Sequence, residues 1–140
     1  MAAELPWQTR SLPTAYDVLA PDGSEIRLLA EVNGASTVHC TLPAGAVTQA
    51  VRHQTVEETW FFLSGVGEVW RRSRSHEEVT SVHAGVALTI PLGTEFQFRT
   101  IGDLPLTFII TTIPPWPGPN EAIPVEGWWA APAGSMGTER

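Results

Sequence analysis

The chain has 140 residues, of which 43% are hydrophobic and 16% are charged, and its formal net charge is -7. This length suffices for one domain with a substantial core, and this composition is typical of a folded globular protein rather than a disordered chain. The negative charge disfavours nucleic acid and anionic membranes as partners, because both are themselves densely negative.

The chain has a single cysteine, Cys40, which leaves no intrachain disulfide and favours a reducing compartment. No stretch approaches eighteen consecutive apolar residues, and the start MAAELPWQTR lacks the features of a signal peptide. We therefore expect a cytoplasmic protein that does not contact membranes.

Short runs rich in Val, Ile, Thr and aromatic residues follow one another along the chain, separated by turn residues. In chain order they are EIRLLA (25–30), STVHCTL (36–42), TWFFL (59–63), GEVWRR (67–72), EEVTSV (77–82), VALTI (86–90), EFQFRT (95–100) and LTFIITT (106–112). Each has the length of a β-strand, and their spacing of about ten residues predicts an all-β sandwich or barrel. Asp22-Gly23 and Asn33-Gly34 are expected to form hairpin turns with positive φ.

The two ends of the chain differ from its middle. We expect residues 1–25 to form an arm or an edge strand, and residues 26–112 to form the barrel. Residues 113–140 are rich in proline and tryptophan, so they are expected to form an irregular tail that packs on the barrel.

Residues 48–53 and 58–63 are expected to form a hairpin with a four-residue loop. This pairing places His53 opposite Glu58, with Val51 and Gln49 following on the same face, opposite Trp60 and Phe62. An imidazole beside a carboxylate can act as a tunable proton donor or acceptor, or the two groups can simply satisfy one another. Both interpretations remain open at this point.

The residues around this pair resemble the cupin superfamily, whose first motif is G-x5-H-x-H-x4-E-x6-G and whose second is G-x5-P-x-G-x2-H-x3-N. The first motif aligns without a gap to Gly45, Val51, His53, Glu58 and Gly65, and the second to Gly85, Pro91, Gly93, Phe96 and Thr100. The resemblance implies a single-domain cupin barrel, that is, a double-stranded β-helix or jelly roll. It also implies a homodimer, the common state in such families.

The same resemblance implies a metal site, because cupins that hold Fe, Mn, Ni or Zn use the histidines and the glutamate of these motifs. Here Val51 and Phe96 occupy two of the four ligand positions, which leaves only His53 and Glu58. Two protein ligands hold a transition metal poorly, so we predict no cofactor. The alternative is a divalent Fe, Mn, Ni or Zn ion with His39 as a third ligand, although His39 alternates with Cys40 along its strand.

The resemblance further implies that Phe96 and Phe98 point inward, toward His53 and Glu58. Such a pocket suits an apolar or aromatic small molecule, although the aromatic side chains could also fill the barrel completely. The predicted ligand-binding residues are Gln49, Val51, Trp60, Phe62, Phe96, Phe98 and Trp116, the last as a lid or as packing on the outside.

Three functions are consistent with these residues. The first is a metal-independent lyase, isomerase or cyclase in which Glu58 orients His53 for acid–base catalysis. The second is a binding protein without chemistry, and the third is a metal-dependent enzyme of the dioxygenase type. The apolar outer face of the hairpin, with Ala50, Phe61 and Leu63, predicts a covering sheet or a dimer partner.

Overall fold

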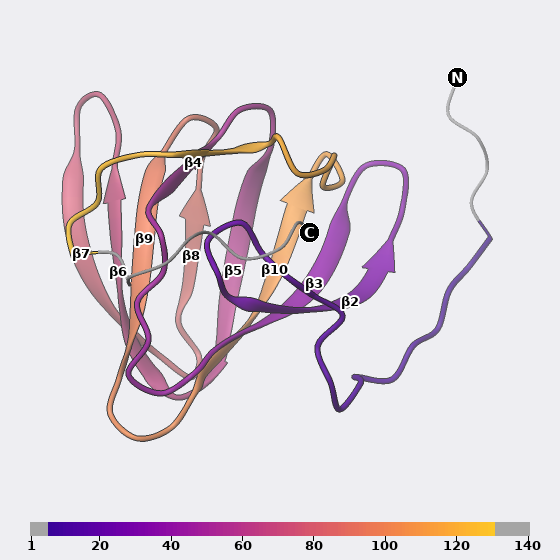
Figure 1. Cartoon of the computed structure of the whole chain (residues 1–140). Helices are drawn as coiled ribbons and strands as arrows, with labels where there is room; N and C mark the ends of the chain where they lie inside the picture. The colour runs from indigo at the N-terminus through magenta and orange to yellow at the C-terminus, as the bar shows by residue number, and fades with distance from the viewer. Residues whose placement is uncertain (1–5, 131–140) are drawn as a thin grey trace.

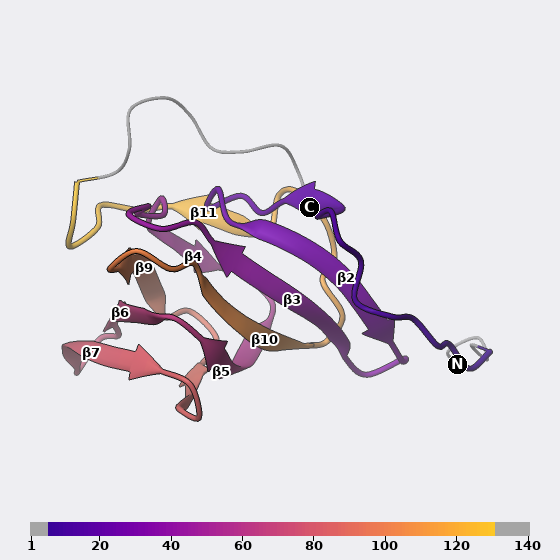
Figure 2. The same ribbon diagram turned by 90° about the horizontal axis from the view of Figure 1, so that it is seen from below.

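The computed structural model describes residues 6–130, which form two antiparallel sheets that face each other (Figures 1 and 2). Sheet A has six strands in the order β1-β2-β3-β10-β5-β8, and sheet B has five in the order β11-β4-β9-β6-β7. The strands of sheet A are β1 (Val18–Leu19), β2 (Glu25–Glu31), β3 (Ser36–Leu42), β5 (Glu57–Ser64), β8 (Ala87–Ile90) and β10 (Leu106–Ile113). Those of sheet B are β4 (Val51–His53), β6 (Val66–Arg72), β7 (Glu77–His83), β9 (Glu95–Ile101) and β11 (Ala122–Pro124). The predicted all-β jelly roll is confirmed.

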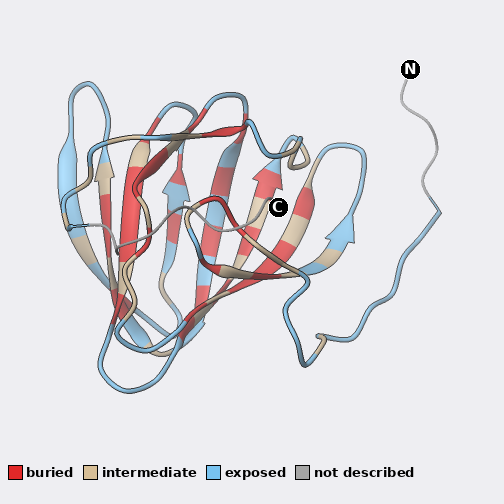
Figure 3. Ribbon diagram, viewed as in Figure 1, coloured by how far each residue is buried: buried red, intermediate tan, exposed pale blue. Residues whose placement is uncertain are grey.

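The interior between the sheets, called the lumen below, receives alternate residues of each strand, as the burial pattern in Figure 3 shows. Its centre is filled by Trp60, Phe62, Phe98 and Phe108, whose neighbouring ring centroids lie 4.6 to 6.2 Å apart. Aromatic rings at these separations attract one another in edge-to-face and offset geometries. Cys40 is fully buried in the same core.

The expected hairpin between residues 48–53 and 58–63 is wrong. β4 pairs with β9 and β11 in sheet B, whereas β5 pairs with β10 and β8 in sheet A. Residues 54–56 therefore cross from one sheet to the other. Inner residues of facing sheets also meet, but across a gap of about 10 Å between backbones rather than about 5 Å along a ladder. His53 and Glu58 thus reach the same lumen from opposite walls.

The two predicted turns differ in geometry. Gly23 has a φ of +95°, as expected for the first turn, and the backbone NH of Ala20 donates to Ser24 O across it. At the second turn neither Asn33 nor Gly34 has a positive φ, which corrects the prediction. The β2–β3 pairing ends at Glu31 and Ser36. The four-residue loop that remains is of the length usually built around a type I turn, which needs no positive φ.

The tail is attached to sheet B by a short strand and by a pair of buried hydrogen bonds. Figure 1 shows the tail (yellow) crossing that sheet. β11 pairs with β4, with Ala122 opposite His53. The fully buried side chain of Gln97 then accepts from Trp129 N (2.9 Å) and donates to Trp129 O (3.0 Å). These contacts hold residues 120–130 against the barrel. Residues 1–5 and 131–140, which belong to the expected arm and tail, lie outside the described residues.

The described part of the N-terminal arm runs beside β2 and leaves the body of the molecule (Figures 1 and 2). Arg10 donates to Leu28 O at 2.6 Å and forms an ion pair with Asp17 at 3.0 Å, while Trp7 is 95% exposed. Within residues 6–130 no helix is long and apolar enough to cross a membrane.

Glu121 fixes the crossing between the two sheets, and its titration is expected to be visible in stability. Its carboxylate accepts from Thr55 N (2.6 Å), Thr55 Oγ1 (2.6 Å) and Val56 N (2.9 Å). Burial opposes its ionisation, but these hydrogen bonds and the charge of His53 outweigh burial and hold the pKa of Glu121 below its ordinary 4.5. A lowered pKa stabilises the fold above the pKa of the unfolded chain, and this contribution disappears as pH falls through the folded value.

We therefore predict that Glu121→Gln lowers the free energy of unfolding by about 2 kcal/mol at pH 7 and by much less at pH 3. Guanidinium denaturation at both pH values measures the difference. Glu126→Gln, an exposed change in the same tail, serves as the control. Equal losses for Glu121→Gln at pH 7 and pH 3 would contradict this account.

Candidate functional site

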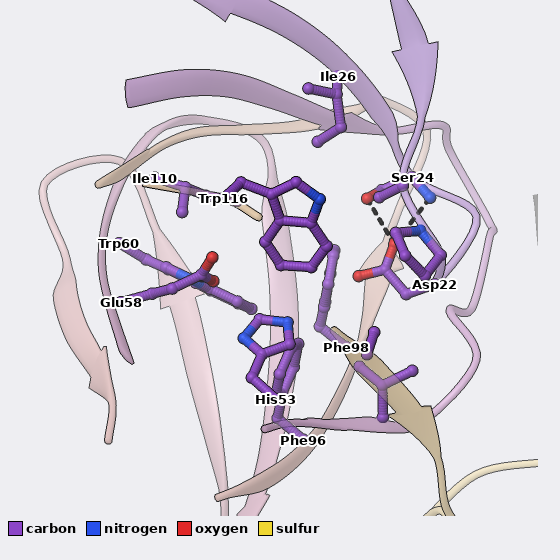
Figure 4. Close-up of a pocket in the computed structure, with 14 residues that line it drawn as sticks. Asp22, Ser24, Ile26, His53, Glu58, Trp60, Phe96, Phe98, Ile110 and Trp116 are labelled. Carbon is purple, nitrogen blue, oxygen red and sulfur yellow. Dashed lines mark hydrogen bonds between the residues drawn. The ribbon is translucent and has the colours of Figure 1, made fainter. Parts of the chain in front are cut away.

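One end of the lumen contains a small cavity to which both sheets and the tail contribute (Figure 4). Val51 and Phe96, opposite one another on β4 and β9, form one wall, and Trp60 and Ile110 of sheet A form another. Trp116, from the segment after β10, lies between these walls. The cavity is therefore lined mainly by apolar side chains, and its few polar groups stand out.

Glu58 is the first of these polar groups. It is 3% exposed, and its two carboxylate oxygens accept from Trp60 Nε1 (3.0 Å) and Thr112 Oγ1 (2.7 Å). The sheet register sets this arrangement, because Thr112 lies directly opposite Glu58 and Trp60 is the next inward residue of β5. Both oxygens are thus oriented by donors that the core holds in place.

His53 is the second polar group and ends β4. It is 5% exposed, and its ring packs edge-on against Phe96 and Trp116 at centroid distances of 5.1 Å each. Its Nδ1 is buried and has no hydrogen-bond partner among the described residues. In Figure 4 the two ring nitrogens face the cavity, one on the side of Glu58 and the other on the side of Asp22. A histidine that served only packing would normally have its buried nitrogens satisfied.

Asp22 is the third polar group, and sequence reasoning missed it. It lies in the turn between β1 and β2, where Ser24 N (2.9 Å) and Ser24 Oγ (2.6 Å) both donate to Oδ1. Burial raises the pKa of Asp22, with a further rise from the charge of Glu58, although the Ser24 hydrogen bonds and His53 oppose it. The sequence marked this residue only as part of a turn, because no pattern indicated that the turn folds over the mouth of the barrel.

The structure brings most of the predicted site residues to this one cavity. Lining it are His53, Glu58, Val51, Trp60, Phe96, Phe98 and Trp116. Phe62 does not line it, because its side chain is fully buried deeper in the core. Gln49 instead lines a neighbouring surface groove that shares Asp22 with the cavity.

The volume of the cavity is small. About 20 Å³ is open to the centre of a water molecule, which is room for about one water. The indole of Trp116 lies in the middle of the residues that line the cavity (Figure 4). The expectation of a site lined by aromatic rings and the expectation of a filled barrel are therefore both met in part.

The donor set at the site does not fit a tightly held transition metal. Among the described residues, no three His, Cys, Asp or Glu side chains are grouped so that they could hold an ion. Val51 and Phe96, at the two positions where the resemblance expects histidine, are buried hydrocarbons. His39, the candidate third ligand, is opposite Arg27 and Ile109 on the outer face of sheet A, because its neighbour Cys40 points into the core. It cannot reach the lumen.

Comparisons with known proteins agree with this architecture. Residues 38–112 match the family model described as "Cupin domain". An uncharacterized protein of Methanocaldococcus jannaschii is 30% identical over 114 residues, which cover 75% of this chain and 88% of that protein.

Solved structures resemble this one in fold. A variant of Bacillus subtilis oxalate decarboxylase superposes with a TM-score of 0.65 at 16% identity, covering 78% of this chain and 30% of that chain. KdgF from Halomonas sp. gives 0.56 at 16% identity, with 65% and 80% covered. BH2720 from Bacillus halodurans gives 0.60 at 20% identity, with 73% and 77% covered. At these identities the likeness concerns the fold alone, and this chain spans less than a third of the oxalate decarboxylase.

The hydrogen bond that orients Glu58 can be removed without changing the shape of the core. We predict that Thr112→Val lowers the free energy of unfolding by about 2 kcal/mol, because Oε2 of a buried carboxylate loses a donor. Urea denaturation measures the loss. Thr111→Val, on the same strand but the opposite face, is the control and is expected to change stability by less than about 0.5 kcal/mol. Equal losses for the two substitutions would show that the hydrogen bond from Thr112 to Glu58 is not the source of the lost stability.

Proposed function

Because this chain belongs to the cupin family, we propose that it is a small-molecule cupin enzyme in which His53 moves a proton with the support of Glu58. The substrate class is an apolar or aromatic small molecule, and the reaction class is lyase, isomerase or cyclase without a bound metal ion. The observation that carries the proposal is the buried, unpartnered Nδ1 of His53, in the same cavity as an oriented carboxylate.

The roles of the two groups follow from their surroundings. His53 takes a proton from an acidic carbon or hydroxyl of the substrate at one ring nitrogen, or returns it there. The carboxylate of Glu58, held in place by Trp60 and Thr112, stabilises the positive charge that develops on the ring during the transfer. The aromatic walls exclude water, which strengthens the electrostatic interaction between the two groups.

A cupin that binds a small molecule without chemistry is the second candidate function. The lining of the cavity favours it, because apolar and aromatic walls are sufficient for binding without any catalytic group. The third candidate, a metal-dependent enzyme of the dioxygenase type, requires donors besides His53 and Glu58, because these are the only ligand-type side chains at the motif positions.

Solvent exchange separates catalysis from binding. Small aromatic compounds that raise the melting temperature are incubated with the protein in D2O, and deuterium incorporation or product formation is followed by mass spectrometry. We predict that His53→Ala lowers this rate at least about 100-fold while the affinity for the compound changes little. His83→Ala, at an exposed histidine, is the control. A rate that survives His53→Ala would contradict the proposed role, and binding without exchange would favour the second candidate.

Elemental analysis of protein purified without chelator or metal-affinity resin tests the third candidate. Substoichiometric Fe, Mn, Ni and Zn together with full activity is the expected result. One equivalent of any of them, with activity that is lost on its removal, would replace the acid–base proposal by the metal-dependent one.

We also propose that the protein is a homodimer. The outer face of sheet A exposes Phe61 (48%) and Leu63 (42%) on β5, whereas Ala50 is covered by Gly127 of the tail. Neighbouring exposed apolar side chains on a sheet favour contact with a second protein surface. Light scattering is expected to give a dimer for the wild type and a monomer for Phe61→Glu. A monomeric wild type would contradict this proposal.

A further inference from the structure

The carboxyl group of Asp22 faces the cavity with one oxygen while its other oxygen is occupied. Both hydrogen bonds from Ser24 end on Oδ1. In Figure 4 the second oxygen of Asp22 is turned toward the cavity, on the side where Trp116 and His53 lie. An acceptor held in this way in an apolar enclosure is suited to receive one hydrogen-bond donor from a bound molecule.

Trp116 lies between the polar groups of the site but does not come from the barrel. Its backbone NH donates to Ser36 Oγ at 3.2 Å, and the residues that flank it, Ile113, Pro117 and Pro119, are exposed. The segment is anchored at one end by β10 and at the other by Glu121. Between these anchors the Trp116 side chain is thus the main part of the segment that enters the protein.

Three ionisable side chains do not normally gather around a residue that only fills the core. Burial of such groups is unfavourable, and natural cores normally avoid it. Here Asp22, His53 and Glu58 surround the indole of Trp116, and Figure 4 shows its nitrogen-bearing edge turned toward Ser24 and Asp22. A planar two-ring molecule with an N–H or O–H donor on its rim would have the same shape and the same polarity as this indole.

We propose that Trp116 occupies the place of the ligand, and that Asp22 selects the ligand by accepting a hydrogen bond from its donor. The ligand is a planar aromatic molecule of one or two fused rings with one donor group. It displaces the Trp116 side chain, and its polar edge then lies between Asp22 and His53. This inference rests on the part of the proposed function in which the lumen takes up a small molecule.

The displacement can be observed in the wild-type protein with indole as the probe. Protein labelled with 5-fluorotryptophan gives a fluorine NMR signal for Trp116, which Trp116→Phe assigns. Saturation with indole is expected to move this signal toward the position of an exposed tryptophan. The signal of Trp128, which is 55% exposed in the same tail, stays in place as an internal control. Saturable binding without movement of the Trp116 signal, or no binding up to the solubility of indole, would overturn the proposal.

The role of Asp22 is tested by comparing indole with benzofuran, which has the same two-ring shape but no donor. In Trp116→Ala at pH 8, calorimetry is expected to show about tenfold tighter binding of indole than of benzofuran. The added change Asp22→Asn abolishes this preference, because the amide NH2 then faces the cavity while its oxygen accepts from Ser24. The added change Asp103→Asn, at an exposed residue, preserves the preference. A preference that survives Asp22→Asn overturns the role of Asp22, and if Trp116→Ala does not fold, the same ligand pair is compared in the wild type and Asp22→Asn.

These tests measure binding only. The ligand site and the proton-transfer function can therefore be contradicted independently of each other. Movement of Trp116 together with a rate that survives His53→Ala would remove the proton-transfer function and leave the ligand site. A His53-dependent rate without movement of the Trp116 signal would remove the ligand site at Trp116 and leave the proton-transfer function.

Discussion

The carboxylate of Glu58 is the group on which the whole site depends. A carboxylate at 3% exposure would be strongly unfavourable without partners, and here Trp60 Nε1 and Thr112 Oγ1 each donate to one oxygen. Both donors come from the register of sheet A, in which Thr112 is opposite Glu58. A slip of this register by one residue would turn Glu58 outward, so that its carboxylate would no longer lie in the lumen. The fold thus determines the chemistry through one strand pairing.

Stability and function make opposite demands on the remaining polar groups. Asp22 is held in a site that raises the pKa of its carboxyl group by burial, and His53 carries a buried nitrogen without a partner. Either feature costs stability, although the ring of His53 also packs edge-on against Phe96 and Trp116. Groups of this kind are concentrated at functional sites, where unfavourable burial is retained for its chemistry. Trp116, which is partly buried, packs edge-on against His53 and lines the same cavity.

Most of the strands were predicted correctly from the sequence. The placement of His53 and Glu58 in one lumen was also correct, but the hairpin from which it was inferred does not exist. Alternation of apolar and polar residues shows which side chains point inward, so His53 and Glu58 were correctly assigned to one lumen. It does not show which strands pair, and their expected pairing as a hairpin is wrong because β4 and β5 belong to different sheets. The inward assignment survives, since residues that face inward from either sheet meet in the same interior.

Two other features depended on contacts between distant parts of the chain. Asp22 reaches the cavity only because its turn folds over the barrel mouth, where Gln49 N donates to Asp22 O at 3.0 Å. β11 forms in a proline-rich segment because β4 offers it a free edge, with Ala122 opposite His53. Both contacts join segments that are far apart in the sequence, so a local sequence pattern cannot predict them. By contrast, the spacing of the glycines and the proline in the two motifs identified the fold, since those residues fix turns locally.

We infer that the polar side chains of the lumen, His53 above all, are kept for function and not for stability. The most direct test is the free energy of unfolding of His53→Leu at pH 8.5, measured with urea. Leucine is close to histidine in size and brings no polar atom into the aromatic enclosure, so the account predicts a gain of about 1 kcal/mol over the wild type. A loss of 2 kcal/mol or more would mean that His53 supports the fold, and would contradict the claim.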